Sequence, residues 1–253
     1  MEQLSISGNG CTDIGYNRMV NEDYYGMKDF LFVLADGMGG HNAGEIASKL
    51  AVDHILRLID FNEASDFDEI TDEIDVQQMI HTAIIKTNDI IYKESLQRID
   101  YNGMGTTLVL ALFRRPHTMH IANVGDSRAY LIRNDMIELL TQDHTITANL
   151  LRDGTITQIE AKNHPYRHYL SQSIGTSQDV KAFTKSFSIR LGDNILLCSD
   201  GLWNVLTNEE MITIFKKHSS SKKICKALIA RAKELHSIDN ISCIVISIST
   251  LKK

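Results

Sequence analysis

The sequence is poor in the residues that mark fibrous, secreted and nucleic-acid-binding proteins. Two prolines and fifteen glycines among 253 residues exclude collagen, mucin-like stalks and long flexible linkers. The net charge is −6, without a Lys/Arg tract, so we expect neither nucleic acid nor a membrane as partner. The longest apolar runs, Phe30–Ala35 and Leu108–Phe113, are too short to cross a bilayer. The first ten residues have no basic start and no apolar core, so we expect no secretory signal.

Cysteine is also scarce, and its spacing excludes a zinc site. The four cysteines, at positions 11, 198, 225 and 243, contain no C-x-x-C pair, and neither a Cys₂His₂ pattern nor H-E-x-x-H occurs. A chain of this length does not need disulfides to fold. We therefore expect reduced thiols and a cytoplasmic location.

Cys225 and Arg231 match the C-x₅-R spacing of cysteine-based phosphatases. That phosphate cradle needs small residues whose backbone N–H groups turn inward. The interval here is Lys-Ala-Leu-Ile-Ala, without glycine. Ile224, Leu228 and Leu235 instead follow one stripe of a core-facing helix. We interpret the match as chance.

The rest of the composition is that of an ordinary globular protein, with 43% hydrophobic and 23% charged residues. The length allows one large domain or two modest ones. In the first half of the chain, Phe30–Ala35 is typical of a buried strand. A helix is expected from Asn42, with Glu45 completing a capping box. Residues 61–75 are acidic and predict a loop, and a second helix is expected near 76–98.

The second half changes to short strand-like segments separated by turn residues. Strands are expected at Thr106–Phe113, Thr118–Val124, Arg128–Arg133, Met136–Leu140, 182–189, 194–199 and Ile241–Ile248. Asn134-Asp135 predicts a hairpin turn, Thr207 and Glu210 predict a helix cap, and 221–236 predicts a helix. Residues 142–170 are polar and irregular, which indicates a surface flap. Strands in hairpins and helices in pairs predict an α+β fold with mainly antiparallel sheets.

Acidic residues stand repeatedly at the ends of predicted strands, several of them beside glycine. The positions are Glu22, Asp23, Asp36, Asp126, Asp200 and Asp239. Any one of them could be an ordinary turn residue, as we interpret Asp135 and Asp193. Their joint pattern instead places them on one common rim of the fold.

Carboxylates gathered in this way have a chemical consequence. Two of them about 4 Å apart repel by ~1 kcal/mol in water and ~4 kcal/mol at an effective dielectric near 20, so a cluster either takes up protons or binds cations. Oxygen ligands without thiolates suit Mg²⁺ or Mn²⁺. Two such ions bridged by one carboxylate can hold a hydroxide for in-line attack on a phosphoryl group.

At these residues the sequence resembles the metal-dependent protein phosphatases, the type 2C Ser/Thr family, in their short bacterial form. The matching segments are TDIGYNRMVNEDYY (12–25), LADGMGGHNAGEIAS (34–48), GMGTTLVLA (103–111), ANVGDSRAYLIR (122–133), TQDHT (141–145), LLCSDGLWNVL (196–206) and DNISCIVI (239–246). The resemblance spans nearly the whole chain in the family's order. It implies a single domain over 1–253, a four-layer α-β-β-α sandwich of two mainly antiparallel sheets flanked by helix pairs, with the flap at 142–170 as a subdomain.

The resemblance also implies roles for the acids. Asp36 would bridge two metal ions, and the backbone carbonyl of Gly37 would complete one site. Glu22 and Asp23 fall in the first acidic motif, where the family places metal-site acids.

The remaining site residues follow from the later motifs. Asp200 and Asp239 would hold the other ion, and Asp126 resembles the acid that recruits a looser third ion. Arg18 corresponds to the phosphate-binding arginine, whose guanidinium can contact two phosphoryl oxygens. His41 is a candidate for phosphate binding or leaving-group protonation, with helix capping as the alternative.

Two positions depart from the family pattern. Met38 stands where eukaryotic members have a histidine proposed as general acid, so a water or another side chain must protonate the leaving group. Asn204 replaces an aspartate, which removes a charge but keeps hydrogen bonding. Trp203 is most simply interpreted as packing, and Asn240 as the residue that orients Asp239.

The hypothesis is a Mg²⁺/Mn²⁺-dependent phosphatase that hydrolyses phosphoserine and phosphothreonine in proteins by direct attack of a metal-bridging hydroxide. The expected partners are phosphorylated proteins, substrates of a Ser/Thr kinase, and the expected state is a monomer. Two alternatives remain open. One is a catalytically silent pseudophosphatase that binds phosphoproteins, and the other is a phosphohydrolase for small molecules.

Overall fold

The computed structural model describes residues 4–39, 43–59, 73–114 and 117–250, and strands in these ranges form two antiparallel sheets. One sheet has the order β1 (Leu4–Asp13), β11 (Ile241–Thr250), β10 (Asn194–Cys198), β7 (Arg128–Arg133) and β8 (Met136–Leu139). The other has the order β2 (Asp23–Lys28), β3 (Leu31–Met38), β5 (Leu108–Arg114), β6 (Thr118–Val124) and β9 (Phe183–Ser188), and the short β4 (Gly105–Thr106) pairs with β3.

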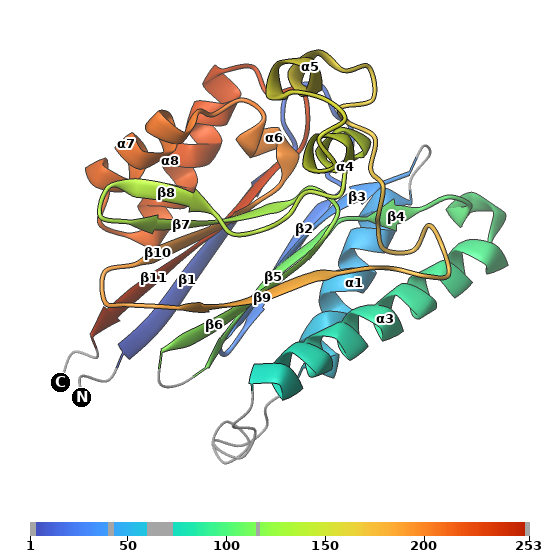
Figure 1. Ribbon diagram of the computed structural model, residues 1–253, viewed down its shortest axis with the longest axis horizontal. Coiled ribbons are helices and arrows are strands. Elements are labelled where there is room, and N and C mark those ends of the chain that lie inside the picture. Colours follow the sequence, from blue (N-terminus) through green and yellow to red (C-terminus); the bar gives the residue numbers. More distant parts are fainter. Residues whose placement is uncertain (1–3, 40–42, 60–72, 115–116, 251–253) are drawn as a thin grey trace.

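A pair of helices covers the outer face of each sheet (Figure 1). Helices α1 (Gly44–Leu58) and α3 (Glu73–Gln97) pack on the sheet that contains β3, and α7 (Asn208–Lys217) and α8 (Ser221–Glu234) pack on the sheet that contains β11. The short helices are η1 (Ile99–Tyr101), α4 (Ile146–Arg152), α5 (Gln158–Asn163) and α6 (Asp200–Trp203). The four-layer α+β sandwich is therefore confirmed. No described helix has both the length and the apolar character needed to traverse a bilayer.

Side-chain alternation along the central strands builds three apolar layers. In β3, Leu31, Val33 and Ala35 face the helices, whereas Phe32 and Leu34 face the opposite sheet. Successive side chains of a strand point to opposite faces, so a strand buried on both faces is apolar throughout. This is why the runs in β3 and β5 are continuous rather than alternating.

Most elements lie where the sequence predicts them. The expected bounds of β6 and β7 agree with the structure, and the hairpin turn is confirmed by the positive φ angles of Asn134 and Asp135 (49° and 63°). Thr207 and Glu210 form the expected capping box of α7. The prediction missed β1 and β2, whose residues are mostly half-buried rather than apolar runs.

Three predictions need correction. The first helix begins at Gly44, behind an Ala43 N-cap without a side-chain cap, rather than at the expected Asn42, which lies outside the described residues. The acidic loop ends earlier than expected, because α3 begins at Glu73; residues 61–72 lie outside the described ranges. The segment 142–170 is not wholly irregular, since Thr145 and Thr157 cap the short helices α4 and α5.

Candidate metal centre

One cavity of about 460 Å³ collects residues from both sheets and from the loops between them. Its lining includes Arg18, Glu22, Asp36, Gly37, Asp126, Asp200 and Asp239. Seven residues predicted for the site thus meet at one place, although they span 221 positions of the chain. The predicted rim of carboxylates exists at this end of the sandwich.

Asp36, near the end of β3, is held by two threonines of the neighbouring strands. The Thr107 backbone N–H donates to the Asp36 carbonyl at 2.8 Å, the Asp36 N–H donates to Thr107 Oγ1 at 3.0 Å, and the Thr106 hydroxyl donates to the same carbonyl at 2.9 Å. Thr107 Oγ1 lies 2.6 Å from the hydroxyl of Ser127, the residue after Asp126. A buried hydroxyl pair therefore links the strand ends that carry Asp36 and Asp126.

Glu22 closes the amino-terminal end of α1. Its carboxylate accepts the N–H of Gly44, in place of the missing side-chain cap, and its carbonyl accepts the N–H of Gly37 at 3.1 Å. A Cβ on Gly37 would clash with the Gly44 carbonyl, and a Cβ on Gly44 would clash with the Glu22 carboxylate. The glycines thus allow β3, α1 and the Glu22 segment to approach closely, and a carboxylate at a helix N-terminus is favourable.

Asp200 and Asp239 come from the other sheet, at the end of β10 and before β11. The Asn204 side-chain amide donates to Asp200 Oδ2 at 3.1 Å, so this asparagine does keep a hydrogen bond to the acid. Asn240 is buried, and its N–H donates to Asp239 Oδ1 at 2.8 Å. Its side chain also accepts from the Glu22 N–H at 2.8 Å. Asn240 thus contacts Asp239 through its backbone, while its side chain ties the first acidic motif to the last.

Arg18 lies at the cavity wall and pairs with acids. Its Nη2 is 2.7 Å from Asp239 Oδ2, and its Nη1 is 3.8 Å from Glu22 Oε2. The side chain keeps 44% of its surface exposed. The guanidinium can therefore meet a ligand in the cavity while remaining fixed from behind.

Asp23 takes a different position from the other acids. It lies in β2 directly opposite Asp36 of β3, is 5% exposed, and is not part of the cavity lining. One of its oxygens accepts from the Ser199 hydroxyl at 2.8 Å, and the other has no hydrogen-bond partner. Asp23 thus stands behind the cavity acids, beside Asp36.

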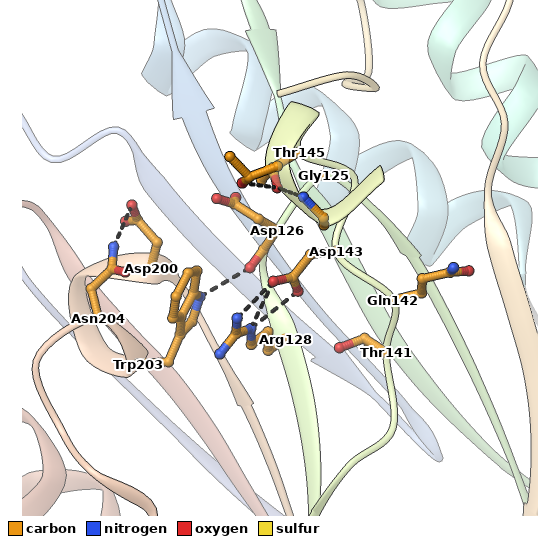
Figure 2. Close-up of polar contacts among 12 residues, drawn as sticks. Gly125, Asp126, Arg128, Thr141, Gln142, Asp143, Thr145, Asp200, Trp203 and Asn204 are labelled. Atoms are coloured by element: carbon orange, nitrogen blue, oxygen red, sulfur yellow. Dashed lines mark hydrogen bonds and ion pairs between the residues drawn. The ribbon is translucent and has the colours of Figure 1, made fainter. Parts of the chain in front are cut away.

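The turn at Asp126 is fixed by contacts that no sequence pattern predicted (Figure 2). The Trp203 indole N–H donates to the Asp126 carbonyl at 2.9 Å. Arg128 stacks on the Trp203 ring, 3.5 Å from its centroid, and its Nη2 lies 2.6 Å from Asp143 Oδ2. Trp203 is therefore more than packing. The cation–π contact with Arg128 fixes the Trp203 ring, and the bidentate ion pair with Asp143 fixes the Arg128 guanidinium in turn.

The motif TQDHT supports the same turn from the other side. The His144 N–H donates to the Gly125 carbonyl at 2.9 Å, and the Gly125 N–H approaches His144 Nδ1 at 3.3 Å. Asn123 reaches the Gln142 carbonyl at 2.8 Å. In the sequence, this support of the Asp126 turn was indicated only by the presence of both TQDHT and GDSRAY in one family pattern. Contacts between residues some twenty positions apart leave no local periodicity that could predict them.

Burial and mutual repulsion raise the pKa values of the acids. Burial is the largest cause throughout, and the neighbouring carboxylates add to it. The pKa of Asp126 rises to about 8, that of Asp23 to about 7 and that of Asp200 to about 6. The pKa of Asp36 also lies well above its ordinary value, because the side chain is buried and other carboxylates surround it. The protein therefore relieves the repulsion by holding protons.

These residues have the chemistry that a divalent cation requires. Buried oxygens of Asp23 and Asp200 have no hydrogen-bond partner, and buried acceptors without partners are rare unless something else satisfies them. Within the described ranges, no three acidic, histidine or cysteine side chains yet converge into a ligand shell. A divalent cation bound among these carboxylates would take the place of their protons, and it would draw the carboxylate oxygens toward itself.

The other predicted features differ in where they lie. His41 lies outside the described residues. Met38 lines the cavity, as do His168 and Leu170 of the predicted flap. Arg231, the arginine of the C-x₅-R match, instead pairs with Glu210 at 2.7 Å. That match is therefore not a phosphate site.

Comparison with known proteins identifies the class to which this fold and site belong. The family model for protein phosphatase 2C matches residues 16–235. The serine/threonine phosphatase stp of Listeria innocua is 36% identical over 251 residues, covering 96% of each chain. The chain belongs to the protein phosphatase 2C family, in its short bacterial form.

Solved structures narrow this to a protein serine/threonine phosphatase. The crystal structure of serine/threonine phosphatase Stp1 from Staphylococcus aureus has a TM-score of 0.85 at 33% identity, covering 98% of this chain and 97% of that one. The catalytic domain of the serine/threonine phosphatase PstP, in complex with two manganese ions, has a TM-score of 0.84 at 29% identity, covering 98% and 100%. These likenesses support dependence on a divalent metal.

Proposed function

We propose that the protein hydrolyses phosphoserine and phosphothreonine in phosphoproteins by direct attack of an activated water, with Mg²⁺ or Mn²⁺ as cofactor. Bound divalent cations would supply an activated water and neutralise charge on the phosphoryl group. Two ions would suit this acid set, and Asp126 would recruit a third. The observation that carries the proposal is the convergence of acids from both sheets, with Arg18, on one cavity.

Most of the acids would bind the metal ions directly, and one would act from behind them. Asp36, whose pKa is raised by acids of both sheets, would contribute to both metal sites, with the Gly37 carbonyl and Glu22 completing one of them. Asp200 and Asp239 would hold the other side. Asp23 lies behind Asp36, where its carboxylate would raise the negative charge of the site. Arg18 would turn its fork toward the phosphoryl oxygens and offset their charge.

Among the described residues that line the cavity, thiol nucleophiles are absent and the Ser and Thr hydroxyls are engaged in hydrogen bonds. None of them is a cysteine. The Ser237 hydroxyl donates to the Gly201 carbonyl at 2.7 Å, and the Thr107 hydroxyl is held by Ser127. This favours attack by water in one step, without a phosphoenzyme.

Substrate choice would lie in the flap at 142–170, whose His168 and Leu170 reach the cavity. Segments beside a rigid site usually carry selectivity. The relatives named serine/threonine phosphatases support phosphorylated proteins, made by a Ser/Thr kinase, as the substrates. We propose that the enzyme acts as a monomer.

The test is hydrolysis of a phosphothreonine peptide and of p-nitrophenyl phosphate with Mn²⁺, Mg²⁺ or chelator. Asp36→Asn and Asp200→Asn are expected to lower turnover by at least 10³-fold, because each removes a central charged ligand. Asp135→Asn, in the exposed hairpin turn, is the matched control and should keep full activity. Turnover by the wild type should vanish with chelator and survive thiol alkylation.

The alternatives give different results. A pseudophosphatase would bind the phosphopeptide without turnover under any metal. A small-molecule phosphohydrolase would turn over phosphorylated metabolites faster than the peptide. Activity that persists with chelator would contradict the proposal itself.

A further inference from the structure

The fold brings all four cysteines into one apolar layer, although their spacing in the sequence shows no pattern. Cys11 of β1 lies directly opposite Cys243 of β11, which in turn lies opposite Cys198 of β10. The three thiols form a row across the sheet on the face that α8 covers, and Cys225 of α8 packs on this row. This layer is separate from the acidic cavity, whose lining includes no cysteine.

Cys225 is the centre of the group. Its Sγ donates to the Asn9 carbonyl at 2.8 Å, and its own backbone carbonyl accepts from the Cys243 thiol at 3.9 Å. Asn9 also donates from its side chain to the Ser221 hydroxyl at 2.7 Å, which ties β1 to the first turn of α8. Cys225 therefore lies against the stretch of β1 that carries Asn9 and Cys11, and the backbones that carry the two cysteines are fixed to each other.

The two thiols differ in ionisation and access. Hydrogen bonds from Cys243, and then from the backbone and Cys11, lower the pKa of Cys225. Burial and the neighbouring Cys225 raise the pKa of Cys11, although Lys226 and Lys222 oppose this. Cys11 is half-buried, whereas the other three cysteines are buried. Cys225 is thus the thiol of the pair with the lower pKa, and Cys11 is the one nearest solvent.

We propose that Cys225 and Cys11 form a peroxide-sensitive thiol pair that closes to a disulfide between α8 and β1. The Cys225 thiolate attacks one oxygen of a hydroperoxide, the O–O bond breaks, and the other oxygen leaves as water or alcohol after taking a proton. This gives a sulfenic acid at Cys225. Cys11 then attacks that sulfur, the S–S bond forms, and water leaves. The two thiols are oxidised by two electrons, and the peroxide is reduced by two.

The direct test is a map of disulfides after oxidation of the folded, metal-loaded protein. Reduced protein is treated with hydrogen peroxide, free thiols are blocked by alkylation after denaturation, and peptides are analysed by mass spectrometry without reduction. The expected product is a Cys11–Cys225 cross-linked peptide, two hydrogens lighter than the separate peptides, with Cys198 and Cys243 alkylated. Thiol reductant should reverse it. A cross-link to Cys243 or Cys198, or none at all, would overturn the proposal.

Variants test the order of the two steps. Cys11→Ser should stop at a sulfenic acid on Cys225 that dimedone traps, whereas Cys225→Ser should leave Cys11 largely unreacted. Cys198→Ser, in the same layer, is the matched control and should form the disulfide as the wild type does. If Cys11→Ser reacted exclusively at Cys243 or showed no dimedone adduct, the assignment of Cys225 as first nucleophile would be wrong. The wild-type map keeps the test valid if a serine variant fails to fold.

Discussion

At the scale of single residues, the position of each acid in the site depends on neighbouring side chains that are not expected to bind the metal themselves. Trp203 donates to the Asp126 carbonyl and is held by Arg128, which is in turn fixed by Asp143. Asn240 joins Asp239 to the segment that carries Glu22. Such contacts decide where a carboxylate can point, and they come from distant parts of the chain.

Trp203→Phe tests this support. The variant loses the indole hydrogen bond but keeps a ring for Arg128, and a neutral hydrogen bond contributes about 1 kcal/mol. We expect Mn²⁺ affinity, measured by calorimetry, to fall roughly three- to tenfold, and activity to recover at high Mn²⁺. Tyr130→Phe removes another partner of Arg128 without touching Asp126, so its Mn²⁺ affinity should stay close to that of the wild type. Equal affinity in Trp203→Phe would refute the role of the indole.

His120 in β6 gives a pH dependence of stability. Burial, and then the charge of Arg114, lowers its pKa to about 4, against about 6.5 in an unfolded chain. The unfolded state therefore binds the proton more tightly. This contribution to stability is fully present above pH 6.5 and is lost as the pH falls toward 4, about 2–3 kcal/mol by pH 4.5.

The measurement is urea unfolding of metal-free protein from pH 7 to pH 4.5, compared with His120→Gln. The difference in unfolding free energy between the two proteins should shrink by about 2–3 kcal/mol between pH 7 and pH 4.5. His164→Gln, on the exposed flap, serves as control and should follow the wild-type curve. Parallel curves for wild type and His120→Gln would contradict the expected shift.

At the scale of elements, the sequence predicts the start of a helix correctly when the residues that cap it belong to the same segment. Helix α7 is an example, because Thr207 Oγ1 accepts from the Glu210 N–H at 3.2 Å and Glu210 returns a bond to the Thr207 N–H at 3.0 Å. The start of α1 is the counter-example. Its first turn is closed by Glu22, more than twenty residues earlier in the sequence, so no local capping signal could locate it.

Thr207→Ala is expected to lower the unfolding free energy by about 1 kcal/mol, the usual effect of removing a Thr N-cap. Urea denaturation would measure it as a lower midpoint with an unchanged m-value. Thr207→Ser retains the hydroxyl and should stay within a few tenths of a kcal/mol of the wild type. If alanine and serine had the same effect, the cap would not be the cause.

At the scale of the whole molecule, the sandwich brings the acids of two sheets together and makes metal binding and protonation compete. Asp36, Asp126, Asp23 and Asp200 all have raised pKa values, so a cation must displace protons near neutral pH. Calorimetry with Mn²⁺ in two buffers of different ionisation enthalpy should show proton release at pH 7. The release should decline as the pH rises above about 8, because Asp200, Asp23 and Asp126 are then increasingly ionised before the metal binds. Release that does not depend on pH would contradict the shifts.

The same raised pKa values determine how the stability of the metal-free protein changes with pH. Because the folded pKa values lie above the unfolded value near 4, these groups contribute most below pH 4. Their contribution is lost as the pH rises through about 6 to 8, the range of the raised values. Adding Mn²⁺ should restore stability most strongly at the alkaline end.

The sequence by itself determined the class of fold, the family and the identity of most cavity acids. Periodicity located β6, β7 and α7 because apolar spacing and capping are properties of neighbouring residues. The family motifs marked Asp36, Asp126, Asp200 and Asp239, and the structure brings these residues to one cavity.

Only the tertiary structure decided what depends on contacts between distant residues. It placed Asp23 behind the cavity rather than in its wall, closed α1 with Glu22, and made Trp203 a support of Asp126. It also gathered Cys11 and Cys225 across 214 positions of sequence. Such pairs meet because two sheets and their covering helices pack in one arrangement, and packing between layers leaves no period in the sequence.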